Sequence, residues 1–179
     1  RKTLYLFVLI FIVQISWAQT PLELKLFDLP DVVFEKIKTP QGFESAYILK
    51  VKQPLDHKDL SKGHFYQKVH LSHRGFDQNT VIITEGYTRD RNRIYELTDL
   101  VNGNQIGVEH RFFGESMPDP MDYDYLNLEQ ATADYHNIKT LFEKIYNNKW
   151  ISTGISKGGA TTIFYRYFYP DDVDVCVPY

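Results

Sequence analysis

One stretch, residues 150–170, restricts most strongly what this chain can fold into. Residues 150–153 are apolar and β-prone, which predicts a short buried strand. Residues 160–169 predict a helix that ends at Pro170, because proline lacks the amide hydrogen that a helix interior needs. The pentapeptide GISKG stands between them at 154–158. A G-x-S-x-G sequence at a tight strand-to-helix turn is typical of a nucleophile elbow.

The residue types at this turn have a physical reason. Gly154 and Gly158 lack the Cβ atoms that would collide between the strand and the incoming helix, and Gly159 lets that helix start close to the sheet. Ser156 then projects at the helix N-terminus, where the helix dipole and free N–H groups favour a developing negative charge. We expect Ser156 to be the nucleophile and the backbone N–H of Lys157 to be an oxyanion donor. The alternative is a glycine-rich turn with an incidental serine, because short motifs recur by chance.

The first 18 residues form a separate unit of the sequence. Two basic residues precede an apolar run over residues 4–15, and Ser16 and Ala18 are small residues three and one before a cut. This order predicts a signal peptide over residues 1–18, cleaved after Ala18, and a secreted or periplasmic mature protein with no membrane association. A membrane anchor is the alternative, but the run is shorter than the roughly 20 residues that span a bilayer.

Composition and histidine placement exclude other classes of function. The chain is 43% hydrophobic with a formal net charge of −3, and it has no basic run, so we expect a globular domain that binds no nucleic acid. Strand alternation places His73 on the opposite face from His64 and His70, whereas zinc needs three or four convergent ligands. We therefore expect no metal and no cofactor. The histidines are predicted to be surface or loop residues, apart from His110, which is predicted to make structural hydrogen bonds near the site.

Hydrophobic periodicity places the remaining elements. Residues 19–44 show no regular pattern and are expected to be an irregular N-terminal segment that leads into the domain. Antiparallel strands followed by alternating strands and helices then indicate an α/β fold with parallel central strands over residues 45–179. The expected elements are strands at 46–52, 64–72, 80–84, 105–109 and 173–177 and helices at 92–101 and 127–146.

Five motifs occur together in one order: QPLDH at 53–57, FYQKV at 65–69, TEGY at 84–87, EHRFFGES at 109–116 and GISKGG at 154–159. This set resembles the secreted serine peptidases related to prolyl carboxypeptidase and dipeptidyl peptidase two. It is most similar to their bacterial relatives, the prolyl tri- and tetrapeptidyl aminopeptidases, because the eukaryotic-type branches are expected to carry tyrosine where Lys157 stands. The resemblance implies an α/β-hydrolase core with a helical cap after the elbow, and release of short peptides with a preference for proline.

The order of the chain predicts that part of the catalytic machinery lies elsewhere. In α/β-hydrolases the triad follows the order serine, acid, histidine. After Ser156 there are three aspartates and no histidine, and Asp171 and Asp172 follow Pro170 and are expected in a surface turn. We therefore expect residues 45–179 to be the N-terminal part of a peptidase domain, truncated after the elbow helix and the strand that follows it. Such a fragment lacks the triad acid and histidine and is inactive alone.

The site residues predict a secreted serine exopeptidase that forms an acyl-enzyme on Ser156. A second oxyanion donor is expected at Gly86 or Tyr87, in the loop after the strand at 80–84. Glu85 and Glu109 end buried strands on the site side, where a carboxylate can bind the free amino terminus of a peptide substrate.

Other interpretations of these residues stay open. Glu85 and Glu109 are instead buried acids if they pair with a neighbouring arginine: Arg89, Arg91 or Arg111. If Ser156 is the nucleophile but Glu85 and Glu109 bind no peptide amino terminus, the whole protein is instead a secreted esterase or lipase, since the fold does not determine the substrate. A non-catalytic remnant is the third possibility.

Overall fold

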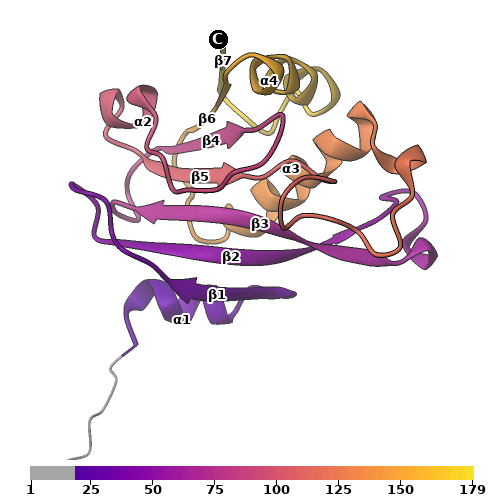
Figure 1. Cartoon of the computed structure of the whole chain (residues 1–179). Coiled ribbons are helices and arrows are strands. Elements are labelled where there is room, and N and C mark those ends of the chain that lie inside the picture. The colour runs from indigo at the N-terminus through magenta and orange to yellow at the C-terminus, as the bar shows by residue number, and fades with distance from the viewer. Residues whose placement is uncertain (1–18) are drawn as a thin grey trace, which may run out of the picture.

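A mixed sheet forms the centre of the protein and places its strands in the order β1-β2-β3-β5-β4-β6-β7 (Figure 1). The computed structural model describes residues 19–179, so the expected signal peptide lies outside the described residues. The strands are β1 (Val32–Lys36), β2 (Ser45–Pro54), β3 (His64–His73), β4 (Thr80–Thr84), β5 (Asn104–Val108), β6 (Trp150–Gly154) and β7 (Val175–Pro178). β1, β2, β3 and β5 pair antiparallel, whereas β5, β4, β6 and β7 pair in parallel.

Helices cover both faces of this sheet. Within residues 19–179 they are α1 (Pro21–Phe27), α2 (Glu96–Leu100), α3 (Leu128–Phe142) and α4 (Lys157–Phe168), with short 3-10 turns at Leu60–Lys62 and Tyr123–Tyr125. The main core lies between the sheet and α1, α3 and α4, and a smaller core lies on the α2 side. Among the described residues, no helix combines the length and apolar character that crossing a membrane requires.

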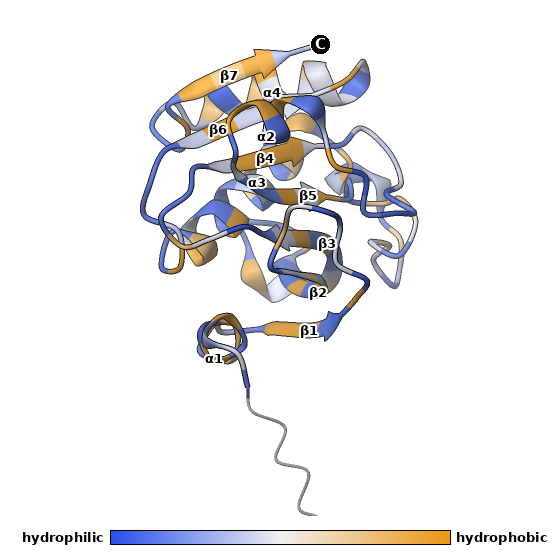
Figure 2. Ribbon diagram, turned by 90° about the vertical axis from the view of Figure 1, so that its left-hand side faces the viewer, coloured by the Kyte–Doolittle hydropathy of each residue, from blue (hydrophilic) through white to orange (hydrophobic). Residues whose placement is uncertain are grey.

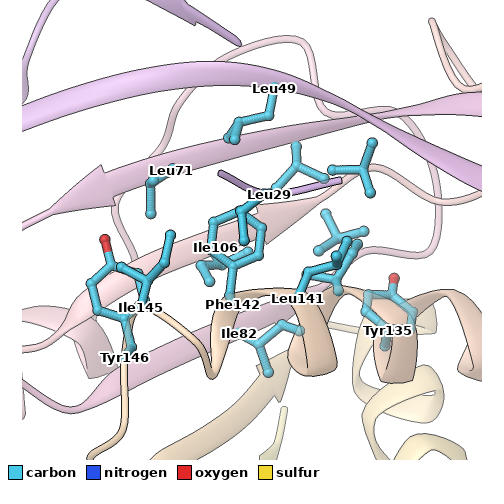
Figure 3. Close-up of a cluster of buried hydrophobic side chains, with 14 of the residues drawn as sticks. Leu29, Leu49, Leu71, Ile82, Ile106, Tyr135, Leu141, Phe142, Ile145 and Tyr146 are labelled. Atoms are coloured by element: carbon cyan, nitrogen blue, oxygen red, sulfur yellow. The ribbon is translucent and has the colours of Figure 1, made fainter. Parts of the chain in front are cut away.

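The central strands β4, β5 and β6 are buried along their whole length, as their sequences predict. Figure 2 shows hydrophobic residues along β4. On β4, Ile82 packs in the main core, whereas Val81 and Ile83 pack in the smaller core on the opposite face. Figure 3 shows Ile82 and Ile106 from β4 and β5 facing Phe142 of α3. The predicted α/β-hydrolase core, with antiparallel strands leading into a parallel sheet, is confirmed.

The expectation of an irregular segment over residues 19–44 is wrong. Thr20 and Glu23 form a reciprocal capping box at the start of α1, and Pro21 occupies its first turn, where proline is tolerated. The helix buries Leu22 and Leu26 in the main core. β1 then pairs with β2 and forms one edge of the sheet. The segment is therefore an integral part of the fold.

The helix predicted over 92–101 is shorter, because side chains take the backbone groups that a helix would use. The Arg93 carbonyl accepts from Arg89 Nη2 and from Gln105 Nε2, both at 2.8 Å. Gln105 Oε1 also accepts from the Tyr95 N–H at 2.8 Å, which leaves α2 to begin at Glu96.

Helix α3 begins after Asn127, close to the predicted start, and Asn127 caps it from one side only. The Asn127 side chain accepts from the Gln130 N–H at 3.0 Å. Gln130 does not return this contact: its side chain bonds Asp56 and the His57 N–H in the loop after β2. The strand predicted at 173–177 forms as β7 at the edge of the sheet, where, among residues 19–179, it pairs with β6 alone and leaves Val175 48% exposed.

Candidate active site

Ser156 stands at the junction of β6 and α4 in a conformation that serine rarely adopts. Its backbone has φ 56° and ψ −118°, and it makes no side-chain cap to the helix that follows. Such backbone geometry in a non-glycine residue costs about 1–3 kcal/mol and persists only where the surroundings impose it. Here the Ser156 N–H donates to the Tyr179 carbonyl at 2.9 Å, and the Ser156 carbonyl accepts from the Ala160 N–H at 3.0 Å. The exposed side chain therefore projects from a rigid turn.

Three glycines allow this turn to form, as the sequence predicts. A Cβ on Gly158 would lie 2.3 Å from the Thr84 carbonyl oxygen, and one on Gly154 would lie 2.4 Å from the backbone of Gly158. A Cβ on Gly159 would lie 2.3 Å from the Tyr179 carbonyl oxygen. The start of α4 therefore rests directly on the ends of β4 and β7, with backbone against backbone.

The expected oxyanion donors lie beside one another. Lys157 begins α4, and within residues 19–179 its backbone N–H donates no hydrogen bond to another residue. The loop after β4 touches the same place, because a Cβ on Gly86 would lie 2.5 Å from the Lys157 Cβ. Gly86 is buried and Tyr87 is exposed. This geometry supports the predicted roles of the Lys157, Gly86 and Tyr87 amides, which stay predictions.

Glu85 lies just before this loop and pairs with an arginine, which is the second of the two interpretations that its sequence position allowed. Its carboxylate accepts from the Arg89 guanidinium and, at 3.3 Å, from the Tyr95 hydroxyl. Its side chain remains 19% exposed. The Tyr135 hydroxyl bonds both the N–H and the carbonyl of Glu85, each at 3.1 Å, and so fixes the backbone that leads into the loop.

Glu109 does not fit the expected role of binding a peptide amino terminus. It is only 1% exposed. One carboxylate oxygen accepts from the Arg89 N–H at 2.8 Å. The other accepts from the Glu115 N–H at 2.8 Å and from the Ser116 N–H and hydroxyl at 3.1 and 2.9 Å. With both oxygens occupied by loop groups, Glu109 organises the two loops beside the site and has no free face for a substrate.

The prediction that the histidines are surface or loop residues is wrong for two strand positions. His70 and His73 are each 2% exposed, because β3 is covered on both faces. His73 Nδ1 lies 2.9 Å from the Tyr146 hydroxyl. His110 behaves as predicted: its ring donates from Nδ1 to the Arg111 carbonyl at 2.8 Å, and its N–H donates to the Tyr87 carbonyl at 3.1 Å. Burial lowers the pKa of His110.

Three histidine–carboxylate pairs occur in the described part of the chain, away from any contact with Ser156. His73 Nε2 lies 3.6 Å from a Glu44 carboxylate oxygen. His57 Nε2 lies 2.8 Å from Asp134, and His136 Nδ1 lies 2.8 Å from Asp172. Asp171 and Asp172 lie in a turn after α4, as predicted, and Asp171 is exposed. The predicted surface position is wrong for Asp172, which is 8% exposed and accepts from the Tyr165 hydroxyl. Within residues 19–179 no hydrogen bond joins a histidine to Ser156, and no group of side chains has the arrangement of a metal site.

A buried ion pair behind the site was missed by reasoning from sequence. Arg111 and Asp134 are 0% and 1% exposed by side chain, and their bidentate contacts are both 2.8 Å. Arg111 also donates to the carbonyls of Pro54, Leu55 and Tyr125. The pair thereby ties the EHRFFGES and QPLDH motifs to α3, and the joint occurrence of these motifs is the signal that could have found it.

The strained serine at the end of a central parallel strand assigns the chain to the serine hydrolases of the α/β-hydrolase fold. Solved structures agree on the fold: acetyl xylan esterase 1 from Thermoanaerobacterium sp. JW/SL YS485 superposes with a TM-score of 0.58 at 13% identity, over 86% of this chain and 55% of that one. Acetyl xylan esterase from Paenibacillus sp. R4 gives 0.59 at 12% identity, over 84% and 53%.

Sequence comparison then identifies the family. Residues 20–179 match the family described as PS-10 peptidase S37, and the chain belongs to this serine-peptidase family. It is 36% identical over 166 residues to the prolyl tri/tetrapeptidyl aminopeptidase of Streptomyces mobaraensis, covering 92% of this chain and 35% of that protein. It is 28% identical over 102 residues to the putative serine protease pcp-1 of Caenorhabditis elegans, covering 48% and 18%. The chain thus spans about a third of the length of the aminopeptidase.

Proposed function

We propose that the complete protein is a secreted serine exopeptidase that releases short peptides, with a preference for proline, from substrates with a free amino terminus. The observation that carries this proposal is the exposed Ser156 in its strained turn, beside a Lys157 N–H that donates to no other group within residues 19–179. The 36% identity to an aminopeptidase that is named for prolyl tri- and tetrapeptides supports the substrate class.

Each residue of the site has a place in this reaction. The Ser156 hydroxyl oxygen attacks the scissile carbonyl carbon while a histidine accepts its proton. The Lys157 N–H and an amide of the 86–87 loop stabilise the negative charge on the carbonyl oxygen. The carbon–nitrogen bond then breaks, the histidine returns the proton to the leaving amine, and water hydrolyses the acyl-enzyme. We propose that this histidine and its acid lie outside residues 19–179, because no histidine among these residues forms a hydrogen bond with Ser156.

Glu85 is the remaining candidate for binding the substrate's amino terminus. Its carboxylate is partly exposed and directly precedes the loop that carries Gly86 and Tyr87, whereas Glu109 is buried. Arg89 neutralises part of the Glu85 charge, so a bound ammonium would share this carboxylate with the guanidinium. Export through cleavage after Ala18 belongs to the same proposal, since it would place the enzyme where extracellular or periplasmic peptides are available.

The test compares matched chromogenic peptides that end in proline before the leaving group, one with a free amino terminus and one acetylated. The complete protein should hydrolyse the free peptide in strong preference to the acetylated one. Ser156→Ala should lower kcat on the order of a millionfold, as loss of a triad serine does. Ser61→Ala, at an exposed serine in the loop after β2, should be unchanged.

Three outcomes would overturn the proposal. Normal turnover in Ser156→Ala would show that Ser156 is not the nucleophile. Equal hydrolysis of free and acetylated peptides would show that the protein does not need a free amino terminus and is not an aminopeptidase. Hydrolysis of simple acyl esters without any hydrolysis of peptides would identify an esterase.

A further inference from the structure

The side chain of Lys157 connects the elbow to two neighbouring loops. Its ammonium nitrogen lies 4.6 Å from the centre of the Tyr87 ring and 4.8 Å from the centre of the Phe113 ring. The two rings meet edge to face, with centroids 5.4 Å apart and an angle of 89°. Among residues 19–179, no carboxylate lies within ion-pair distance of this ammonium group. Its partners are therefore the two aromatic faces, which attract a cation through their negative potential.

The aliphatic part of the same side chain lies against the backbone of Gly86. A Cβ on Gly86 would stand 2.5, 2.7 and 3.0 Å from the Cβ, Cγ and Cδ atoms of Lys157. No larger residue at position 86 leaves room for this contact. Lys157 therefore touches the loop after β4 along its methylene groups and again, through Tyr87, at its charged end.

These contacts have a consequence for the oxyanion site. The two expected donors come from separate segments, the Lys157 N–H from the first turn of α4 and the second N–H from residues 86–87. Both must lie about 2.7–3.1 Å from the same substrate oxygen for the transition state to be stabilised. The loop with Tyr87 is mostly exposed at its tip, since Tyr87 is 56% exposed. A contact that fixes this loop to the start of α4 therefore fixes the spacing of the donors.

We propose that the Lys157 side chain is a positioning residue, which holds the 86–87 loop against the elbow through Gly86, Tyr87 and Phe113 and so sets the geometry of the oxyanion hole. This inference rests on the proposed function, because it needs Ser156 to be the nucleophile. Positioning of this kind acts in the transition state more than in substrate binding. Its loss therefore lowers kcat and leaves KM largely unchanged.

The experiment uses the complete protein with Lys157→Met, which keeps the stem and removes the charge, and Lys157→Arg, which keeps a cation for the rings. Lys157→Met should lower kcat about tenfold, the range expected for one cation–π contact, with KM within about twofold. The rate at which a serine-reactive phosphonate modifies Ser156 should fall in parallel. Lys157→Arg should recover most of both. Lys25→Met is the matched control, since Lys25 lies 5.5 Å over Phe76 in another part of the molecule.

A second variant tests the same contact from the other side. Tyr87→Leu should lower kcat by a similar factor, and the double variant with Lys157→Met should lose less than the product of the two single losses, because both remove one interaction.

Each contrary outcome removes a defined part of the account. Wild-type kcat in Lys157→Met, equal loss in Lys157→Arg, or a loss confined to KM would overturn the positioning role while the proposed function stands. Absence of phosphonate labelling at Ser156 in the unmodified protein would overturn the proposed function itself, and the inference with it.

Discussion

Two regions on either side of the sheet's centre are held together in opposite ways. Behind the site, side chains carry the contacts: Arg111 and Asp134 join the loop after β2, the loop after β5 and α3 in one buried network. At the elbow, backbone meets backbone because side chains are missing, and Gly154 and Gly158 pack directly against their neighbours. The first region is therefore damaged by removing a side-chain group, and the second by adding one.

The two regions also have different roles, one in stability and the other in the conformation of Ser156. The buried network contacts no part of Ser156 and fixes the frame from which the loops emerge. The glycine contacts hold Ser156 itself in its unusual conformation. Stability changes in the first region should thus be larger than in the second, whereas changes in kcat should be larger in the second.

The largest loss of stability is expected for Asp134→Asn. Removing the carboxylate leaves the charge of Arg111, which is 0% exposed, without its partner, and breaking such a buried pair costs about 3–5 kcal/mol. Chemical denaturation of the complete protein measures the free energy of unfolding. Glu143→Gln is the matched control, because its ion pair with Lys139 is exposed and should contribute no more than about 0.5 kcal/mol. Equal effects of the two variants would contradict the contrast between buried network and surface.

A smaller loss of stability, together with a large loss of activity, is expected for Gly158→Ala. The added methyl group would stand 2.3 Å from the Thr84 carbonyl oxygen, and overpacking of this kind costs about 1–3 kcal/mol. Because the first turn of α4 must move, kcat should fall on the order of a hundredfold. Gly75→Ala serves as the control, since its Cβ would lie at ordinary contact distance, 3.4 and 4.0 Å, from two atoms of the flexible Gln78 side chain. An active, fully stable Gly158→Ala enzyme would refute the backbone-contact account.

The smallest effect concerns pH and His70. Burial lowers the pKa of His70 to about 4, and the positive charges of Arg89 and Lys68 act in the same direction, against Glu115. The unfolded chain therefore binds a proton more readily than the folded one between about pH 6.5 and pH 4. The stability that neutral His70 contributes is complete above pH 6.5 and is lost as the pH falls toward 4.

The pH effect is measured as a difference between two proteins. Between pH 7 and pH 5 the native protein should lose about 1–2 kcal/mol more than His70→Gln does. Ser61→Ala, at an exposed residue without a titrating group in this pH range, is the control, and its slope should match that of the native protein. If His70→Gln and the native protein share one slope, the buried histidine does not titrate as described.

The sequence predicted structure best at positions where only one residue type satisfies the local geometry. The glycines around Ser156 could be read directly, because only glycine fits between two backbones, and the alternating strands gave the hairpin of β2 and β3. Long-range polar partners could not be read in this way. The roles of Glu109 and Asp172 depend on loops and helices that fold over them, and a local pattern contains no information on that burial. Capping chemistry at Thr20 was present in the sequence and predicts α1 once it is considered.

The most direct test of the central claim is to treat the complete protein with a serine-reactive phosphonate and to locate the adduct by mass spectrometry. The account predicts one modified residue, Ser156, with activity lost in proportion to its modification and no adduct in Ser156→Ala. An adduct on another serine that accompanies the loss of activity, or continued peptide hydrolysis after Ser156 is fully modified, would contradict it.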